Sequence, residues 1–320
     1  MIKRLLSLCV AGVLLAQGAV AQTFPSRPLK IVVPFGAGGV ADLTARTVAQ
    51  SLTVSLGQPV VIENKPGAGG IVAADAVNKA EPDGYTMLLM SNGNAVSEGL
   101  FKSLPFDTVR DFTPVSTLGF FDIAIVTSAD SRFKTLADLM AYGKANPGKL
   151  NIGSINIGST QNLSAELFKS TSGIDLQVIP FNGTPAVVTA LRGGQIDAAV
   201  EILGPVMTQV TAKALNVLAV TGDKRASYLP NVPTAKESGL TGFVASSWNA
   251  LAVPAKTPKD VVARLNRDIV AAINSPEVKK RLQDLRIDPR SSTPEQASEL
   301  LVSEIKRWGD VIVRAKIQKQ

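Results

Sequence analysis

The chain has 320 residues with 33 basic and 26 acidic side chains, a formal net charge of +7 and no histidine. Without histidine, neither a Ser–His or Cys–His nucleophile nor a histidine-containing zinc site can form, which excludes hydrolytic and zinc chemistry of those kinds. The basic residues are scattered and few aromatic residues stand beside them, so nucleic-acid binding finds no support.

The first 21 residues have the pattern of a secretory signal peptide. Two basic residues precede an apolar run at 5–15, and the small residues at 19–21 match a cleavage site before Gln22. The run is too short for a membrane anchor, so we expect an exported protein located in the periplasm. Cys9 is the only cysteine and would leave with the signal peptide, so core burial without disulfides must stabilise the mature chain.

Short apolar runs alternate with amphipathic segments along the rest of the chain, which predicts α/β layers with mostly parallel strands. The expected strands are residues 29–33, 60–62, 85–90, 123–127, 150–153, 176–179, 198–201, 215–220 and 248–253. A helix should follow the loop at 34–39, and further helices should cover 71–79, 136–144, 163–169, 186–191, 258–274 and 293–316. Prolines and glycines predict an irregular stretch at 230–242.

About 300 residues of this pattern suggest two domains. No linker rich in proline, glycine or serine separates two halves, so we expect the chain to cross between domains on extended strands, at 123–127 and 218–221. The expected division is a signal peptide at 1–21, domain 1 at 22–124 plus 221–320, and domain 2 at 125–220.

The most informative stretch is 29–46, where a buried strand breaks at Pro34 into a loop with three glycines that leads into a helix. Glycine lets the backbone approach a ligand closely, and the helix points its free N–H groups and positive end at the loop. The pattern predicts an anion site formed by Phe35, Gly36, Ala37, Gly38, Gly39 and Ala41.

Residues 36–41 also fit the dinucleotide-binding pattern G-x-G-x-x-G/A. The acidic residue after the second strand, Glu63, comes later than the usual spacing of about 20 residues and opens a loop rich in proline and glycine. The export signal also places the chain where soluble dinucleotide is scarce. An exported dinucleotide-dependent oxidoreductase is therefore a minor alternative, and a purely structural tight turn is another.

Two further polar loops, at 154–162 and 181–185, also follow strands and precede helices. Ser159 or Thr160 would cap the first of these helices and Thr184 the second, and each could be an ordinary cap. Together with the first loop they form three uncharged junctions at strand ends, where open α/β sheets bind ligands. A carboxylate there would be held by backbone N–H groups, hydroxyls and helix dipoles. The loop at 67–70 is a fourth candidate, equally well explained as a structural nest.

Several longer motifs stand in a fixed order between Pro25 and the last expected helix. They include Ile31-Val32-Val33-Pro34-Phe35, Gly38-Gly39 with Asp42 and Arg46, Gly57-Gln58-Pro59-Val60-Val61, Glu63-Asn64-Lys65-Pro66-Gly67-Ala68-Gly69-Gly70, Pro82-Asp83-Gly84-Tyr85-Thr86, Leu104-Pro105-Phe106-Asp107 and Ala145-Asn146-Pro147-Gly148-Lys149-Leu150. With these motifs the chain resembles the exported solute-binding receptors of tripartite tricarboxylate transporters, often called Bug receptors.

The resemblance implies a two-domain type II periplasmic binding protein fold, with mixed, mostly parallel sheets, helices on both faces and the ligand cleft between the domains. It implies a monomer that binds a small organic acid, uses no cofactor or metal and is not an enzyme. It also implies delivery to the large and small membrane subunits of a tripartite permease. The ligand-binding residues that it indicates are Phe35, Gly36, Ala37, Gly38, Gly39, Ala41, Ser91, Asn92, Ser154, Asn156, Gly158, Ser159, Thr160, Asn162, Phe181, Asn182, Gly183, Thr184 and Glu201.

Three positions depart from the family pattern. Asn162 stands where the family usually has histidine, Glu201 stands where it often has aspartate, and Val200 is smaller than the usual aromatic residue. These changes predict a larger and less basic pocket and leave the identity of the carboxylate open. A ligand sensor that docks to a membrane sensor kinase remains an alternative to a transport receptor.

Overall fold

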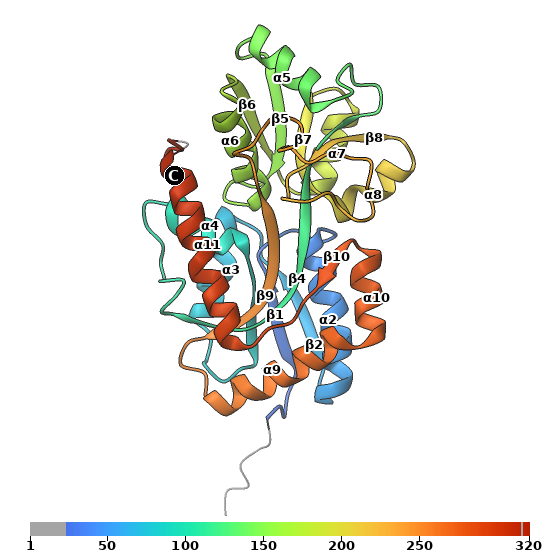
Figure 1. Cartoon of the computed structure of the whole chain (residues 1–320). Helices are drawn as coiled ribbons and strands as arrows, with labels where there is room; N and C mark the ends of the chain where they lie inside the picture. Colours follow the sequence, from blue (N-terminus) through green and yellow to red (C-terminus); the bar gives the residue numbers. More distant parts are fainter. Residues whose placement is uncertain (1–23, 315) are drawn as a thin grey trace, which may run out of the picture.

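The computed structural model describes residues 24–314 and 316–320, so the predicted signal peptide at 1–21 lies outside the described residues. Within the described part, no helix combines the length and the apolar character needed to cross a membrane. The strands and helices form two bodies, one above the other in Figure 1. We call the lower body the first lobe and the upper body the second lobe.

The first lobe is built on a mixed sheet with strand order β2-β1-β3-β9-β4, and β10 pairs with β4. Its strands are β1 (Leu29–Val33), β2 (Val60–Asn64), β3 (Thr86–Ser91), β9 (Ser246–Pro254), β10 (Ile287–Pro289) and the first part of β4 (Phe112–Ser128). Its helices are α2 (Val40–Leu56), η1 (Ala68–Gly70), α3 (Ile71–Asn78), α4 (Asn92–Leu100), α9 (Lys259–Asn274), α10 (Pro276–Asp284) and α11 (Pro294–Arg314).

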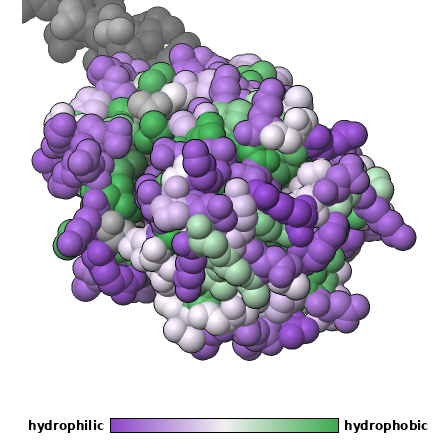
Figure 2. Space-filling model, turned by 90° about the horizontal axis from the view of Figure 1, so that it is seen from above, coloured by the Kyte–Doolittle hydropathy of each residue, from purple (hydrophilic) through white to green (hydrophobic). Residues whose placement is uncertain are grey.

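The second lobe continues the hydrogen-bonded path as β4-β7-β5-β6, and β8 also pairs with β4. Its strands are β5 (Leu150–Ile155), β6 (Leu176–Phe181), β7 (Ala198–Ile202) and β8 (Leu215–Val220), and its helices are α5 (Leu136–Ala145), α6 (Thr160–Ser172), α7 (Thr184–Arg192) and α8 (Leu203–Thr211). Figure 2 looks onto this end of the molecule, where hydrophilic side chains cover most of the surface and apolar residues show in small areas between them.

Both faces of the first sheet are buried at its central strands, such as β3 and β9, as their continuous apolar runs predict. Side chains alternate along a strand, so neighbouring residues of β1 join different hydrophobic clusters. Ile31 belongs to the cluster that contains α2 residues such as Val48, whereas Val32 belongs to the cluster that contains α3 residues such as Ala74.

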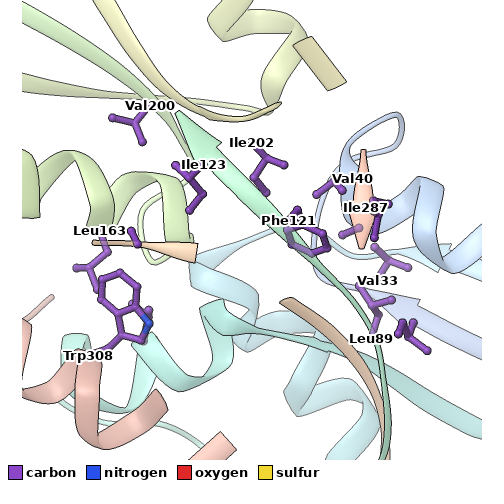
Figure 3. Packing of buried hydrophobic residues seen from close by; sticks show 14 of the residues in the cluster. Val33, Val40, Leu89, Phe121, Ile123, Leu163, Val200, Ile202, Ile287 and Trp308 are labelled. Atoms are coloured by element: carbon purple, nitrogen blue, oxygen red, sulfur yellow. The ribbon is translucent and has the colours of Figure 1, made fainter. Parts of the chain in front are cut away.

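A single long strand, β4, belongs to both lobes. Its residues from Phe112 to Asp122 pair with β9, and from Ile123 onward it pairs with β7 and β8. The larger hydrophobic cluster follows the strand from one lobe to the other: it contains Phe121 and Ile123 of β4, and Ile123 pairs with Ile202 of β7 (Figure 3). The crossing strand is therefore embedded in a continuous core.

The predicted strands are present, but β4 begins at Phe112, well before the predicted start at 123. Pro114 and the register shifts on either side of Thr117 interrupt the apolar pattern of its first part, which hid this part from the sequence analysis. The expectation of parallel strands holds for pairs such as β1–β3 and β5–β6, whereas the strands next to β4 and β9 are antiparallel. Helices α4, α8 and α10 were not predicted.

The two lobes touch through glycines on two sides. A Cβ atom at Gly158, in the loop before α6, would lie 2.7 Å from the Cα atom of Gly69 in the first lobe. A Cβ atom at Gly204, near the start of α8, would overlap the carbonyl oxygen of Leu285, which follows α10. Only residues without a side chain permit backbones to approach this closely, so these contacts define a closed arrangement of the lobes.

Candidate functional site

A cavity of about 110 Å³ lies between the lobes, where β1, β3, β5 and β6 end. This position agrees with the rule that open α/β sheets bind ligands outside the carboxyl ends of their strands. Its lining residues are Phe35, Gly36, Ala37, Gly39, Val40, Ala41, Ser91, Phe121, Ser247 and Asn249 from the first lobe, and Ile155, Asn156, Thr160, Gln161, Asn182, Gly183, Thr184, Pro185, Ile202 and Pro205 from the second. All of these side chains are uncharged.

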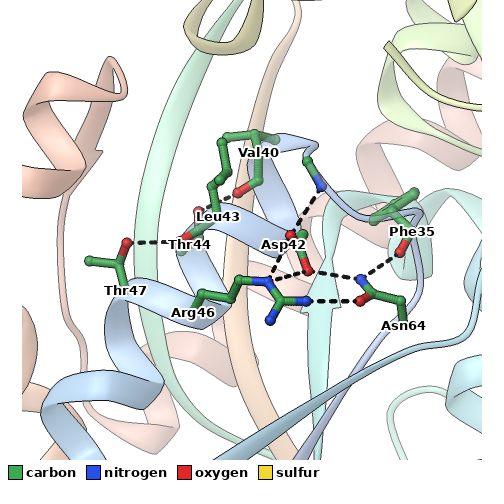
Figure 4. Close-up of polar contacts among 9 residues, drawn as sticks. Phe35, Val40, Asp42, Leu43, Thr44, Arg46, Thr47 and Asn64 are labelled. Carbon is green, nitrogen blue, oxygen red and sulfur yellow. Dashed lines mark hydrogen bonds and ion pairs between the residues drawn. The ribbon is translucent and has the colours of Figure 1, made fainter. Parts of the chain in front are cut away.

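The glycine loop after β1 is held in shape by a buried carboxylate (Figure 4). Asp42, in the first turn of α2, accepts hydrogen bonds from the backbone N–H of Gly38 and from Arg46 Nε, each at 3.0 Å. Asn64 Nδ2 donates both to Asp42 and to the carbonyl oxygen of Phe35, again at 3.0 Å. The network ties both ends of the loop to α2 and β2.

The charge of Asp42 is satisfied within this network. Burial raises the pKa of the carboxyl group, but hydrogen bonds from Arg46, Gly38 and Asn64 outweigh that effect and hold the pKa below its ordinary value. Asp42 therefore stays ionised and paired, and the loop keeps its shape without help from a ligand.

The start of α2 faces the cavity without a cap. Gly39 is the N-cap residue, with φ at −82°, and no side chain accepts a hydrogen bond from this helix end. The N–H groups of Val40 and Ala41 have no partner among the described residues, whereas the N–H of Leu43 bonds to the carbonyl of Gly39. Free N–H groups together with the helix dipole give this end the chemistry that favours an anion.

The floor of the cavity comes from β3 and β9. Ser91 and Asn249 are paired in register on these antiparallel strands, and both are almost completely buried. Asn249 lines the cavity, and its Nδ2 atom is buried without a hydrogen-bond partner among the described residues, so this amide is a further free hydrogen-bonding group beside the cavity. Ser247 Oγ lies 3.1 Å from Thr160 Oγ1, a hydrogen bond that joins the two lobes beside the cavity.

In the second lobe, several polar residues of the 154–162 loop bond to one another. Ser159 caps α6 by accepting a hydrogen bond from the N–H of Asn162, and Asn162 Nδ2 donates to Ser154 Oγ, each at 3.1 Å. These three residues stabilise the start of α6 and lie outside the lining, whereas Thr160 and Gln161 of the same loop and helix line the cavity.

Behind Thr184 and Gln161 lies a fully buried carboxyl group, that of Glu201 on β7. Thr184 Oγ1 donates to Glu201 Oε2 at 3.0 Å. Burial raises the pKa of Glu201 to about 7, although hydrogen bonds from Thr184, Gln161 and the backbone of Ile202 act in the opposite direction. Glu201 Oε1 has no partner among the described residues.

The cavity thus brings together residues from all three predicted loops and from β3. The sequence-predicted residues that line it are Phe35, Gly36, Ala37, Gly39, Ala41, Ser91, Asn156, Thr160, Asn182, Gly183 and Thr184. The predicted residues outside the lining are Gly38, Asn92, Ser154, Gly158, Ser159, Asn162, Phe181 and Glu201. Most of these have another partner: Asn92 Oδ1, for example, accepts a hydrogen bond from Trp308 Nε1 at 3.0 Å.

The lining residues that sequence reasoning missed include Phe121, Ser247 and Asn249. The two β9 residues had a local signal, because the polar residues Ser247 and Asn249 alternate with Trp248 and Ala250. A polar residue at every second position indicates one polar face. The polar face of β9 lies at the cavity because of how β9 pairs with its neighbouring strands, and the local sequence pattern does not reveal this pairing.

The raised pKa of Glu201 predicts a dependence of stability on pH. Its folded-state pKa of about 7 exceeds the ordinary value of 4.5, so the folded protein retains a proton that the unfolded chain releases between these pH values. The favourable contribution is complete below pH 4.5 and is lost as pH rises through 7. The free energy of unfolding can be measured in urea at pH 4.5, 6 and 8. As the pH rises over this range, the free energy of unfolding of the wild type should fall by up to about 3 kcal/mol relative to that of Glu201→Gln.

The control for this experiment is Glu237→Gln. Arg225 holds the pKa of this exposed carboxyl group below its ordinary value, so the loss of its charge should produce a small effect of the opposite sign. A difference between wild type and Glu201→Gln that stays constant from pH 4.5 to 8 would contradict the assignment.

The chain is similar to known proteins over nearly its whole length. The family model TctC, described as tripartite tricarboxylate transporter family receptor, matches residues 44–317. Among individual sequences, protein BugT of Bordetella pertussis (strain Tohama I) is 35% identical over 312 residues, which are 95% of this chain and 96% of BugT.

Solved structures extend the likeness to the fold. The periplasmic binding protein BugD is 31% identical with a TM-score of 0.88, over 93% of this chain and all of the BugD chain. The R. palustris protein Rpa4515, solved with adipate, is 30% identical with a TM-score of 0.89, over 93% of this chain and all of its own. These likenesses confirm the predicted α/β periplasmic binding protein fold.

Proposed function

The chain belongs to the tripartite tricarboxylate transporter receptor family, the periplasmic solute-binding receptors known as Bug proteins, and on this premise we propose that it binds a small organic carboxylate between its lobes. We further propose that it delivers this ligand to a permease with one large and one small membrane subunit. Members of this family are binding proteins and not enzymes.

One observation carries the carboxylate proposal: the cavity combines unpartnered hydrogen-bond donors with an absence of charged lining residues. The N–H groups at the start of α2 and the Nδ2 group of Asn249 are buried donors, and a buried donor without a partner costs about 1–3 kcal/mol. A carboxylate would satisfy several of them at once. Because no lysine or arginine among the described residues lines the cavity, the ligand would be held by dipoles and would leave readily for a permease.

We also propose that the lobes are the two domains, with residues 22–124 plus 221–320 in domain 1 and 125–220 in domain 2. The switch of β4 from β9 to β7 between Asp122 and Ile123 supports the first boundary. The glycine contacts of Gly158 and Gly204 support closure of these domains over the ligand, as in other hinged receptors.

The ligand class can be tested by thermal unfolding of the protein that begins at Gln22, with a panel of dicarboxylates, tricarboxylates, aromatic acids and acidic amino acids. An acid present at about 100 times its dissociation constant should raise the free energy of unfolding by about 2.7 kcal/mol. The matching methyl esters, which lack the charge, should have no effect. Stabilisation by none of the acids, or equally by the esters, would contradict the proposal.

Asn249 provides a test in which stability and binding move in opposite directions. In Asn249→Leu a side chain of similar size removes the unpartnered Nδ2 donor, so the ligand-free protein should gain on the order of 1 kcal/mol of stability. The affinity for the acid found in the thermal screen should fall at least tenfold, as measured by calorimetric titration.

The control for Asn249 is Thr127→Val on β4. Thr127 Oγ1 is also buried without a partner among the described residues, but it lies outside the cavity lining. This variant should gain stability and keep the affinity of the wild type. Unchanged affinity in Asn249→Leu would remove Asn249 from the binding site.

Closure of the lobes is tested at Gly204, which does not line the cavity. Alanine suits a helix better than glycine, so Gly204→Ala should leave α8 intact, yet its Cβ atom would overlap the Leu285 carbonyl in the closed arrangement. We expect the affinity to fall at least tenfold, and the contraction seen by small-angle X-ray scattering on ligand addition to shrink.

Gly309→Ala on α11 is the matched control, because no heavy atom lies within 4 Å of the added Cβ. It should bind and contract like the wild type. If Gly204→Ala does the same, the contact between Gly204 and Leu285 has no part in ligand capture.

A further inference from the structure

The start of α2 and Thr184 offer different hydrogen-bonding groups to the cavity, whereas the amides of Asn156 and Asn182 in the second lobe can both donate and accept. The first-lobe side presents donors, namely the N–H groups at the start of α2 and Asn249 Nδ2. On the second-lobe side, the hydroxyl of Thr184 gives its only proton to Glu201 Oε2 at 3.0 Å. A hydroxyl carries one proton and two lone pairs, so Thr184 Oγ1 retains only acceptor capacity for a bound molecule.

Glu201 imposes this direction on its neighbours. Above pH 7 Glu201 is ionised and can only accept hydrogen bonds, so Thr184 and Gln161 then act as donors toward it. Glu201 is fully buried and does not line the cavity, so it acts on a ligand through these two lining side chains. It also places negative charge one hydrogen bond behind the Thr184 side of the cavity.

The start of α7 does little to attract an anion to this side. Pro185 has no N–H group, and the N–H groups of Gly183 and Ala186 bond to the carbonyls of Phe181 and Gly183, at 3.0 and 3.2 Å. Of the four N–H groups that an uncapped helix start would offer, only that of Thr184 remains. The start of α2, by contrast, contains no proline.

We propose that Glu201 is a specificity-determining residue that makes the Thr184 side of the cavity select a hydrogen-bond donor. The ligand would place its carboxylate against α2 and Asn249 and a hydroxyl or amino group against Thr184. The receptor would therefore prefer hydroxy or amino monocarboxylates over plain dicarboxylates of the same length. This inference rests on the proposed carboxylate binding and deepens it.

The test compares acids of equal length that differ only at the far end. At each chain length of four, five and six carbons, the ligands are the dicarboxylate, the ω-hydroxy acid, the ω-amino acid and the unsubstituted acid. Their affinities are measured by calorimetric titration at pH 8, where Glu201 is charged. The wild type should bind the ω-hydroxy or ω-amino acid at least tenfold more tightly than the dicarboxylate at the chain length that fits best.

Glu201→Gln should shift this ratio at least tenfold toward the dicarboxylate. The amide of glutamine can donate to Thr184 Oγ1, which frees the hydroxyl proton to point into the cavity, and the negative charge behind Thr184 disappears. Thr184→Val, a substitution of similar shape, should abolish the preference of the ω-hydroxy acid over the unsubstituted acid. The double variant Thr184→Val with Glu201→Gln lacks the hydroxyl through which Glu201 is proposed to act. Its ratio of affinities for the ω-hydroxy acid and the unsubstituted acid should therefore equal that of Thr184→Val alone.

The outcomes separate this inference from the proposed function. If the wild type binds none of these acids, nor any acid of the thermal screen, the proposed carboxylate binding is contradicted, and this inference with it. If the wild type binds dicarboxylates more tightly at every length, only the role of Glu201 is contradicted. If Glu201→Gln lowers the affinity for all acids by the same factor, Glu201 has only a structural role. If Glu201→Gln does not fold, Thr184→Val still tests the preference for a hydrogen-bond donor.

Discussion

The strand β4 is the constraint on which the rest of the structure depends. Its first part is hydrogen-bonded within the first lobe and its last part within the second, so the point at which it changes partners sets the position of the cleft. Phe121, one residue before this region of change, lines the cavity, and its neighbour Ile123 packs in the core. Because the crossing is a paired strand and not a loose linker, the lobes remain aligned with each other and the loops of both converge on the same space.

The helices that begin around this space differ in whether a side chain caps their first N–H groups. Ser91 and Ser159 cap α4 and α6 with their own side chains, which accept hydrogen bonds from the N–H groups of Gly93 and Asn162. The helices α2 and α7 begin after glycine and have no side-chain cap, but proline removes a donor from α7. The start of α2 therefore keeps the N–H groups of Val40 and Ala41 without a partner among the described residues, beside the cavity. The Asp42 network keeps the loop before it in a shape that leaves those N–H groups uncovered.

The sequence predicted the parts of this site that depend on local chemistry. In each case a strand, a loop rich in glycine or hydroxyl groups and a helix are contiguous in the sequence. The three loops and the fold class could therefore be inferred from local patterns. Ser247 and Asn249 could not, because they reach the cavity only through the pairing of β9 with β3 and β4. The role of Gly158 was equally hidden, since its contact, Gly69, lies in a distant part of the chain. Asn162 was inferred from a family position, and only the structure shows that its amide bonds to Ser154 within the second lobe.

The absence of charged side chains from the cavity lining has a consequence for the surroundings in which such a receptor works. Attraction between exposed ions weakens as salt is added, because the screening length falls from about 10 Å at 0.1 M to about 3 Å at 1 M. Buried backbone and amide dipoles are shielded from mobile ions by the lobes that enclose them. A protein that holds an anion by such dipoles can keep its affinity nearly constant when the ionic strength of the medium outside the cell rises or falls.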